Sequence, residues 1–102
     1  MARYNCRVDA NQPEIVAGLR AFGAGVLVIS MVKNAFDILV AYEGKLYAME
    51  LKDGDKPPSQ TKLTEGEKKC KKMLNDNRVE YYVVYSLQNA IDVLMKKNLH
   101  FL

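Results

Sequence analysis

Asp37, Glu50 and Lys52 are the residues whose types and spacing could do chemistry in this chain of 102 residues. They lie in two segments, 35–42 and 45–52, whose alternating apolar side chains predict β-strands. The two residues between the segments end in glycine and predict a tight hairpin loop. In the register that this loop imposes, Asp37 lies directly opposite Glu50. Lys52 projects from the same face of the sheet, because side chains alternate with a period of two.

Two carboxylates facing each other across a strand pair destabilise a sheet unless one binds a proton or a cation lies between them. Fold stability therefore gives no reason for this arrangement. A divalent cation such as Mg²⁺ does, because it binds carboxylate oxygens and keeps water positions open for a phosphate. Met49 and Leu51 point to the other face, so the polar residues are segregated on one side. The alternative is a solvent-exposed sheet face with incidental charges.

The elements that must position these residues can be read from the flanking sequence. Asp9, Asn11 and Pro13 are typical of a helix start, with capping side chains and a proline suited to the first turn. This first helix is expected to end near residue 23, and strands are expected over 25–31, 35–42 and 45–52. A helix over 63–75 follows, then a strand over 79–85 and a last helix capped by Ser86. The inner face of the 63–75 helix is expected to be Leu63, Gly66, Cys70, Met73 and Leu74. This order predicts an α/β fold, in which a three-strand meander and a strand brought back by a helical crossover form one mixed sheet.

Positive charge is concentrated in the segment 56–72. This segment holds six lysines and two glutamates, a net charge of +4, whereas the whole chain carries +3. The remaining residues therefore sum to −1. Such a concentration is the footprint expected of a contact with a nucleic-acid backbone. The alternative is the solvated face of an amphipathic helix.

Length and composition exclude several classes of protein. A chain this short predicts one domain over residues 1–102. The longest uncharged stretch, 21–32, is shorter than the roughly 18 residues that a membrane span requires, so we expect no membrane contact. Cys6 and Cys70 are too few for a disulfide framework, and we expect a cytoplasmic protein. No glycine-rich phosphate loop is present, so we expect no nucleotide cofactor.

The chain resembles the PD-(D/E)xK nucleases, in which an aspartate and a Glu-x-Lys pair lie about a dozen residues apart on adjacent strands. Within that superfamily it looks like the small stand-alone VRR-NUC-type, phage-associated nucleases. The resemblance covers nearly the whole chain and is carried by the segments 9–16, 19–24, 36–39, 49–54, 56–59, 63–67 and 83–90. It implies a single nuclease domain with a restriction-endonuclease-like αβββαβ core, and a phage or bacterial origin.

The resemblance also implies the parts of a metal site. Asp37 and Glu50 would hold Mg²⁺ or Mn²⁺ together with the backbone carbonyl of Leu51, and Glu14 would reach the metal directly or through water. Lys52 would orient the attacking water or stabilise the developing negative charge. The residues expected to hold flanking DNA phosphates are Lys56, Ser59, Lys62, Lys68, Lys69 and Lys72.

The chain departs from the family pattern at two places near this site. Phe36 stands where a proline usually precedes the aspartate, and 32–35 lacks the glycines that many relatives have there. Neither change removes a ligand, so what they affect is the preference for substrate shape. Glu67 stands where many relatives have glutamine, and the resemblance assigns it no definite role.

Together these observations predict a metal-dependent endonuclease that hydrolyses phosphodiester bonds in DNA, with a Holliday junction or a flap as the expected substrate. A chain this small has little surface to hold a junction, so we expect a homodimer. One alternative is a catalytically inactive DNA-binding accessory protein with a nuclease fold. Another is an enzyme or binding protein for an unrelated anionic metabolite.

Overall fold

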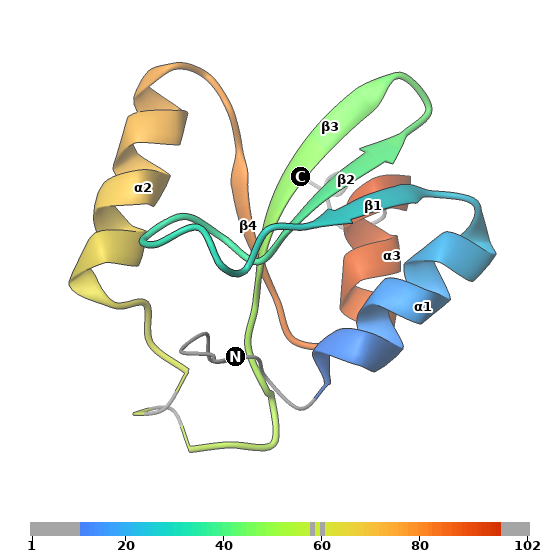
Figure 1. Ribbon diagram of the computed structural model, residues 1–102, viewed down its shortest axis with the longest axis horizontal. Coiled ribbons are helices and arrows are strands. Elements are labelled where there is room, and N and C mark those ends of the chain that lie inside the picture. Colours follow the sequence, from blue (N-terminus) through green and yellow to red (C-terminus); the bar gives the residue numbers. More distant parts are fainter. Residues whose placement is uncertain (1–10, 58, 60, 97–102) are drawn as a thin grey trace.

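Three helices and four strands follow one another in the predicted order in a computed structural model, which describes residues 11–57, 59 and 61–96. The elements are α1 (Gln12–Phe22), β1 (Gly25–Val28), β2 (Ile38–Tyr42), β3 (Lys45–Leu51), α2 (Glu65–Asp76), β4 (Tyr81–Val84) and α3 (Leu87–Met95), shown in Figure 1. Asp9 and Cys6 lie outside the described residues. In the part of the chain that is described, no helix is both long and apolar enough to cross a membrane.

The four strands form one mixed sheet in the order β1-β2-β3-β4. The first three are antiparallel neighbours, and β4 runs parallel to β3 after the crossover through α2. Tyr42 pairs with Lys45 and Ile38 with Met49, so the predicted hairpin register is confirmed. The α/β fold with a mixed central sheet is therefore present.

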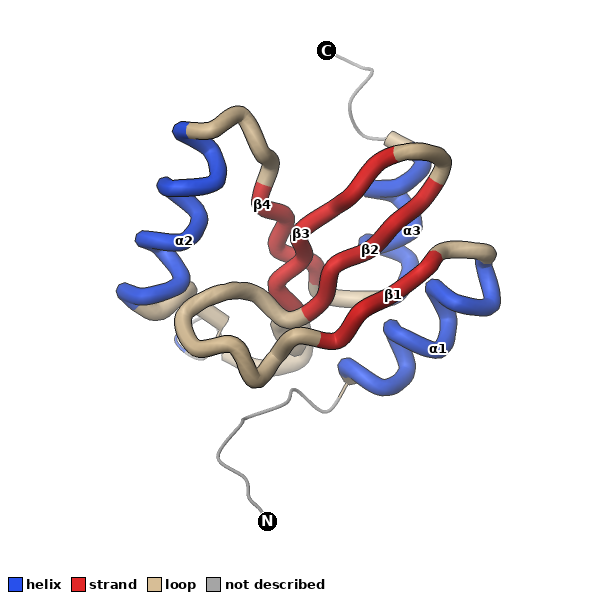
Figure 2. Tube along the Cα trace, turned by 45° about the horizontal axis from the view of Figure 1, so that its top comes forward, coloured by secondary structure: helices blue, strands red, loops and turns tan. Residues whose placement is uncertain are grey.

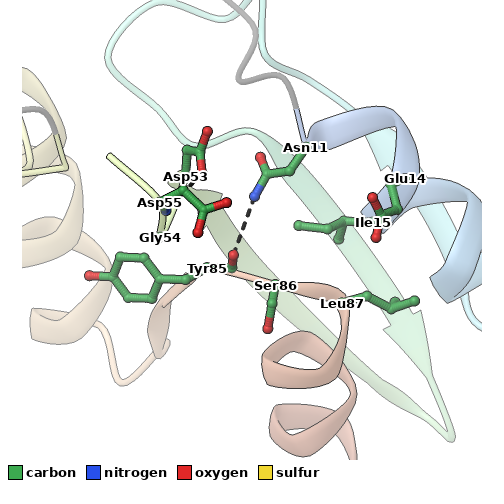
Figure 3. Close-up of a pocket in the computed structure, with 9 residues that line it drawn as sticks. All are labelled: Asn11, Glu14, Ile15, Asp53, Gly54, Asp55, Tyr85, Ser86 and Leu87. Carbon is green, nitrogen blue, oxygen red and sulfur yellow. Dashed lines mark hydrogen bonds between the residues drawn. The ribbon is translucent and has the colours of Figure 1, made fainter. Parts of the chain in front are cut away.

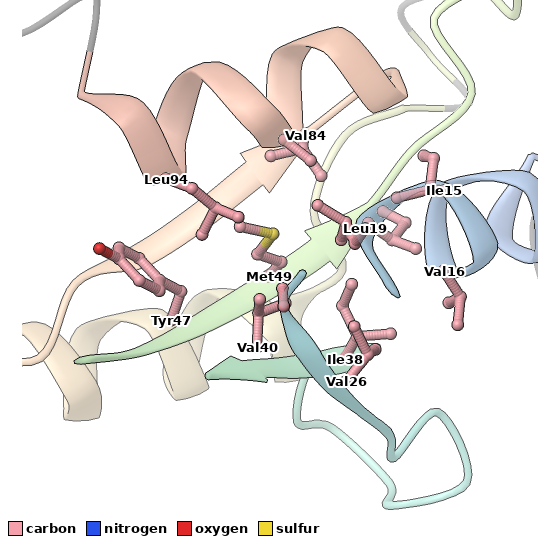
Figure 4. Close-up of a cluster of buried hydrophobic side chains, with 13 residues drawn as sticks. Ile15, Val16, Leu19, Val26, Ile38, Val40, Tyr47, Met49, Val84 and Leu94 are labelled. Carbon is pink, nitrogen blue, oxygen red and sulfur yellow. The ribbon is translucent and has the colours of Figure 1, made fainter. Parts of the chain in front are cut away.

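Helices cover the two faces of the sheet unequally. α1 and α3 lie together on one face, and α2 stands on the other, beside β4 (Figures 1 and 2). The core lies between the sheet and the α1/α3 pair (Figure 4). Its fully buried side chains are Ile15, Leu19, Ile38, Val40, Met49, Leu51 and Val84. Met49 and Leu51 thus point into this core, which leaves the intervening Glu50 on the face toward α2.

Helix α1 begins and ends where its sequence indicates. Pro13 lies in the first turn, and Gly23 ends the helix with a left-handed φ of 110° that suits glycine. Asn11 is the N-cap residue but makes no side-chain capping bond. Its amide instead donates to the backbone carbonyls of Lys52, at 3.2 Å, and Tyr85, at 3.3 Å. The start of α1 is therefore tied to the ends of β3 and β4.

The first two strands are shorter than the sequence predicted. β1 ends at Val28 and β2 begins at Ile38, so the predicted strand residues 29–31 and 35–37 lie in the loop between them. Within this loop Met31 is 77% exposed, and Asn34 has a left-handed φ of 59°. An apolar, β-branched run predicted a longer strand, but the backbone turns where the side chains find no layer to pack against.

Helix α2 is the least buried element of the described structure. A capping box joins Thr64 and Glu67 at its first turn, as the Thr-x-x-Glu spacing predicts. No α2 residue is fully buried, but Leu63, Gly66, Cys70 and Leu74 of the predicted inner face are half-buried, whereas Met73 is 53% exposed. Helix α2 packs mainly beside β4, at the edge of the sheet, so its inner face is only partly covered. Gly66 lies so close to the Asn34 side chain that a Cβ atom would collide with it.

Candidate metal and phosphate site

Asp37 lies at the point where the β2–β3 ladder ends. Its backbone N–H donates to the Met49 carbonyl at 3.1 Å, and its Oδ2 accepts a hydrogen bond of 2.8 Å from the Leu51 backbone N–H. The paired register ends at Ile38 and Met49, and beyond it Asp37 lies close enough to Glu50 for its charge to raise the pKa of Glu50. Leu51, whose carbonyl the family resemblance assigns to the metal, is the last residue of β3.

Glu50 is a buried carboxylate, with 4% of the residue exposed. Burial, together with the neighbouring charges of Asp37 and Glu67, raises the pKa of Glu50 to about 9. The structure therefore holds a carboxyl group that is disfavoured as an anion unless positive charge is added beside it. Two carboxylates with a nearby backbone carbonyl are a donor set that suits Mg²⁺, which completes its coordination with water.

Lys52 places its ammonium between two carboxylates. Its Nζ lies 3.3 Å from Glu50 Oε2 and 3.2 Å from Glu67 Oε1, with 12% of the side chain exposed. Burial alone would lower the pKa of Lys52, but the hydrogen bond to Glu67 and the charges of Glu50 and Glu67 outweigh it, so the net pKa is raised. Lys52 is therefore a charged group on the same face as Glu50, as the period-two rule predicted.

Glu67 joins this cluster from α2, although the sequence assigned it no definite role. Burial would raise the pKa of Glu67, but its hydrogen bonds to the Thr64 backbone, Glu50 and Lys52 lower it overall. A signal for this placement was present in the sequence. Glu67 precedes Cys70 by three residues and Leu74 by seven, which sets it on the same side of the helix.

Glu14 lies elsewhere. It lines a pocket of about 240 Å³ between the start of α1 and the segments that follow β3 and β4, together with Asp53 and Asp55 (Figure 3). Asp37, Glu50 and Lys52 do not line this pocket. Glu14 is also not among the charges that shift the pKa of Glu50. The structure thus brings together three of the expected site residues and sets Glu14 at a different pocket.

The described residues contain no group of three or more histidine, cysteine, aspartate or glutamate side chains arranged to hold a metal ion. A metal at this site would thus rely on the two carboxylates of Asp37 and Glu50, the number that Mg²⁺ commonly takes from a protein.

The residues expected to contact phosphates are all exposed. Lys56 and Ser59 lie in the loop before α2, and Lys62 precedes that helix. Two of the α2 lysines have acidic partners on the helix itself: Lys68 lies 3.4 Å from Glu65 and Lys72 lies 2.8 Å from Asp76. A groove along α2 is lined by Lys62, Leu63, Lys68, Lys71, Lys72, Asn75 and Asp76.

Comparison with known proteins adds no relative: no family model, no curated protein and no solved structure matches this chain.

Proposed function

We propose that this chain is a Mg²⁺- or Mn²⁺-dependent endodeoxyribonuclease, a hydrolase of phosphodiester bonds in DNA. The observation that carries the proposal is a buried Glu50 that lies near enough to Asp37 for the charge of Asp37 to raise its pKa, at the end of the β2–β3 hairpin. A carboxyl group whose pKa is raised to about 9 costs stability as an anion. A site that binds a divalent cation explains why both carboxylates are there.

Asp37 and Glu50 are the side chains that would hold the metal, with the Leu51 carbonyl beside them. When bound, a divalent cation offsets the charge of the scissile phosphate and lowers the pKa of a coordinated water. The Leu51 N–H donates to Oδ2 of Asp37, which fixes the orientation of this carboxylate at the end of β3. Glu50, the second carboxylate, lies on β3.

Lys52 supplies the positive group beside these carboxylates. Its ammonium is mostly buried and is held within 3.3 Å of Glu50. In that position it would orient the attacking water or stabilise charge that develops on the phosphate. Lys56, Ser59 and the exposed lysines on and before α2 would contact flanking phosphates, because α2 stands on the face of the sheet that carries Glu50 (Figure 1).

Branched DNA, a Holliday junction or a flap, is the proposed substrate, and a homodimer is the proposed active form. Cutting two strands symmetrically requires two sites, and one chain carries one Asp37–Glu50 pair. The measurement is cleavage of a four-way junction, a flap and a linear duplex with Mg²⁺, Mn²⁺ or EDTA, together with the mass of the protein in solution.

We expect the protein to cleave DNA with Mg²⁺ or Mn²⁺, and EDTA should abolish this cleavage. The Glu50→Gln variant should not cleave, whereas Glu43→Gln should cleave like the unchanged protein. Glu43 is a suitable control because it is exposed at the hairpin turn, at the other end of the strands. Metal-independent DNA binding without cleavage would instead assign the chain to DNA-binding accessory proteins with a nuclease fold. Failure to bind any of the three DNAs would refute both.

A further inference from the structure

A single oxygen of Glu67 connects helix α2 to Lys52. Glu67 Oε1 accepts a hydrogen bond of 2.9 Å from the Thr64 backbone N–H, which is one half of the capping box. The same oxygen lies 3.2 Å from Lys52 Nζ. In the other half of the box, Thr64 Oγ1 accepts from the Glu67 backbone N–H at 3.1 Å. The group that starts the helix therefore also holds the site lysine.

This contact matters because a lysine side chain has many rotamers, and a poorly placed ammonium contributes little to a reaction. Lys52 lies directly after β3, so the strand orders its backbone but not its four-carbon side chain. Glu50 and Glu67 approach its Nζ from two elements, and each lies within 3.3 Å. With both partners present, the ammonium is confined beside Glu50.

A contact with another part of the chain also holds the first turn of α2 in place. Gly66, the residue before Glu67, lies against the side chain of Asn34. Asn34 belongs to the loop between β1 and β2, which reaches α2 in Figure 1. Since α2 buries no residue in the core, contacts at its first turn are important in deciding where Glu67 lies. Two elements distant in sequence thus fix the carboxylate that reaches Lys52.

We propose that Glu67 is a positioning residue for Lys52. It holds the ammonium beside Glu50 through Oε1, and the Thr64 backbone N–H, which donates to the same oxygen, holds Glu67 in turn. The placement of Lys52 stands on the coordinates alone, whereas its effect on catalysis rests on the proposed nuclease function. The competing role for Glu67 is helix capping only, in which the contact with Lys52 has no consequence.

Two variants separate these roles. Glu67→Ala removes the acceptor for Lys52 and half of the capping box, whereas Thr64→Ala removes only the Thr64 Oγ1 half. The Thr64 backbone N–H that Glu67 accepts from is retained in Thr64→Ala, so the Lys52 contact persists while the helix start is weakened. Glu67→Gln keeps an oxygen acceptor at the same place and removes its charge.

The first measurement is the rate of reductive methylation of each lysine amine, followed by mass spectrometry on the folded full chain. Lys69, which is exposed on the same helix, is the internal reference. We expect Lys52 to react three- to tenfold faster in Glu67→Ala than in the unchanged protein, the range for losing one partly buried ion pair. Glu67→Gln should give a rise of about twofold, and Thr64→Ala should give none.

Equal Lys52 reactivity in the unchanged protein, Glu67→Ala and Glu67→Gln would overturn the proposal. An equal rise in Thr64→Ala and Glu67→Ala would also overturn it, because the effect would then come from helix stability. If Glu67→Ala does not fold, the Lys52 reactivities of Glu67→Gln and Thr64→Ala are compared instead. Equal reactivity in these two variants would then overturn the proposal. This measurement needs no nuclease activity, so it stands even if the proposed function fails.

The second measurement is cleavage of the preferred DNA by the same variants with Mg²⁺. Glu67→Ala should lower kcat about tenfold or more and leave KM within about threefold, because the lysine acts on the transition state. Glu67→Gln should recover most of the lost kcat, and Thr64→Ala should keep it. A change in KM with an unchanged kcat would overturn the positioning role.

Discussion

Asp37 Oδ2 accepts a hydrogen bond of 2.8 Å from the backbone N–H of Leu51. The β2 strand begins one residue after Asp37, so the carboxylate takes the place of a ladder carbonyl at the end of the sheet. The aspartate therefore has a structural task in the fold, in addition to the metal-binding role proposed for it.

The structural task and the proposed metal-binding role predict different outcomes for two substitutions of Asp37. Asp37→Asn keeps an oxygen that can accept from Leu51, so the fold should survive while metal-dependent cleavage is lost. Asp37→Ala should also lose about 1–2 kcal/mol in the free energy of unfolding, because a buried N–H is left without a partner. Urea denaturation in EDTA and the cleavage assay test the pair. Normal cleavage by Asp37→Asn would remove Asp37 from the proposed site.

The burial of Glu50 predicts how the stability of the metal-free protein changes with pH. The folded pKa of Glu50, about 9, lies above the unfolded value of 4.5, so the folded state binds the proton more tightly. The free energy of unfolding should therefore fall as pH rises from 5 to 8, by up to about 1.4 kcal/mol per pH unit. The lowered pKa of Glu67 acts below pH 4.5 and leaves this window unaffected.

Glu50→Gln should remove this dependence, because glutamine is neutral throughout. Denaturation at pH 5, 6, 7 and 8 in EDTA measures the free energy of unfolding at each pH. Glu43→Gln is the control, in which the dependence on pH should be unchanged. The variant should exceed the original protein in stability at pH 8. The same slope in both proteins would mean that Glu50 gains its proton as readily when unfolded.

Lys52→Ala should separate binding from chemistry. One lysine among many contributes little to affinity, so the dissociation constant for DNA should stay within a factor of a few. The cleavage rate at saturating DNA should fall about 10²-fold or more, the scale for losing an electrostatic stabiliser. Filter binding and single-turnover kinetics measure the two quantities. If affinity falls and the saturating rate is spared, Lys52 is a phosphate anchor.

The exposed lysines of α2 should act through counterion release. Replacing Lys68, Lys69 and Lys72 by alanine should flatten the dependence of log affinity on log salt by up to about three units, near one for each true phosphate contact. Lys45→Ala, at the hairpin turn away from α2, is the control and should leave the slope unchanged. Binding measured between 50 and 200 mM salt (about a fourfold range) tests it. An unchanged slope in the triple variant would exclude α2 from the DNA contact.

The contact between Gly66 and Asn34 predicts a reversal of the usual helix rule. Alanine normally stabilises a helix relative to glycine by up to about 1 kcal/mol. Gly66→Ala should instead destabilise the protein by about 1–2 kcal/mol, because the new Cβ meets the Asn34 side chain. In an Asn34→Gly background, which suits the left-handed φ at that position, the same change should be neutral or stabilising. Additive effects in this double-mutant cycle would show that the two residues do not interact.

Local patterns were sufficient to predict the order of the elements and the hairpin register. A two-residue loop and a period of two leave one way to pair β2 with β3, so Asp37, Glu50 and Lys52 could be placed on one face before any coordinates were known. The same rule predicted that Met49 and Leu51 point to the opposite face, and both are buried in the core. Each of these inferences depends on residues that are near one another in sequence.

The tertiary structure decided the contacts between elements that are far apart in sequence. It set Glu67 against Lys52, and it set Glu14 at a pocket with Asp53 rather than beside Glu50. Helical spacing says which residues share a face, but not the angle at which that face meets the sheet. That angle depends on many weak long-range contacts, such as Asn34 against Gly66, which arise only once the whole chain has packed.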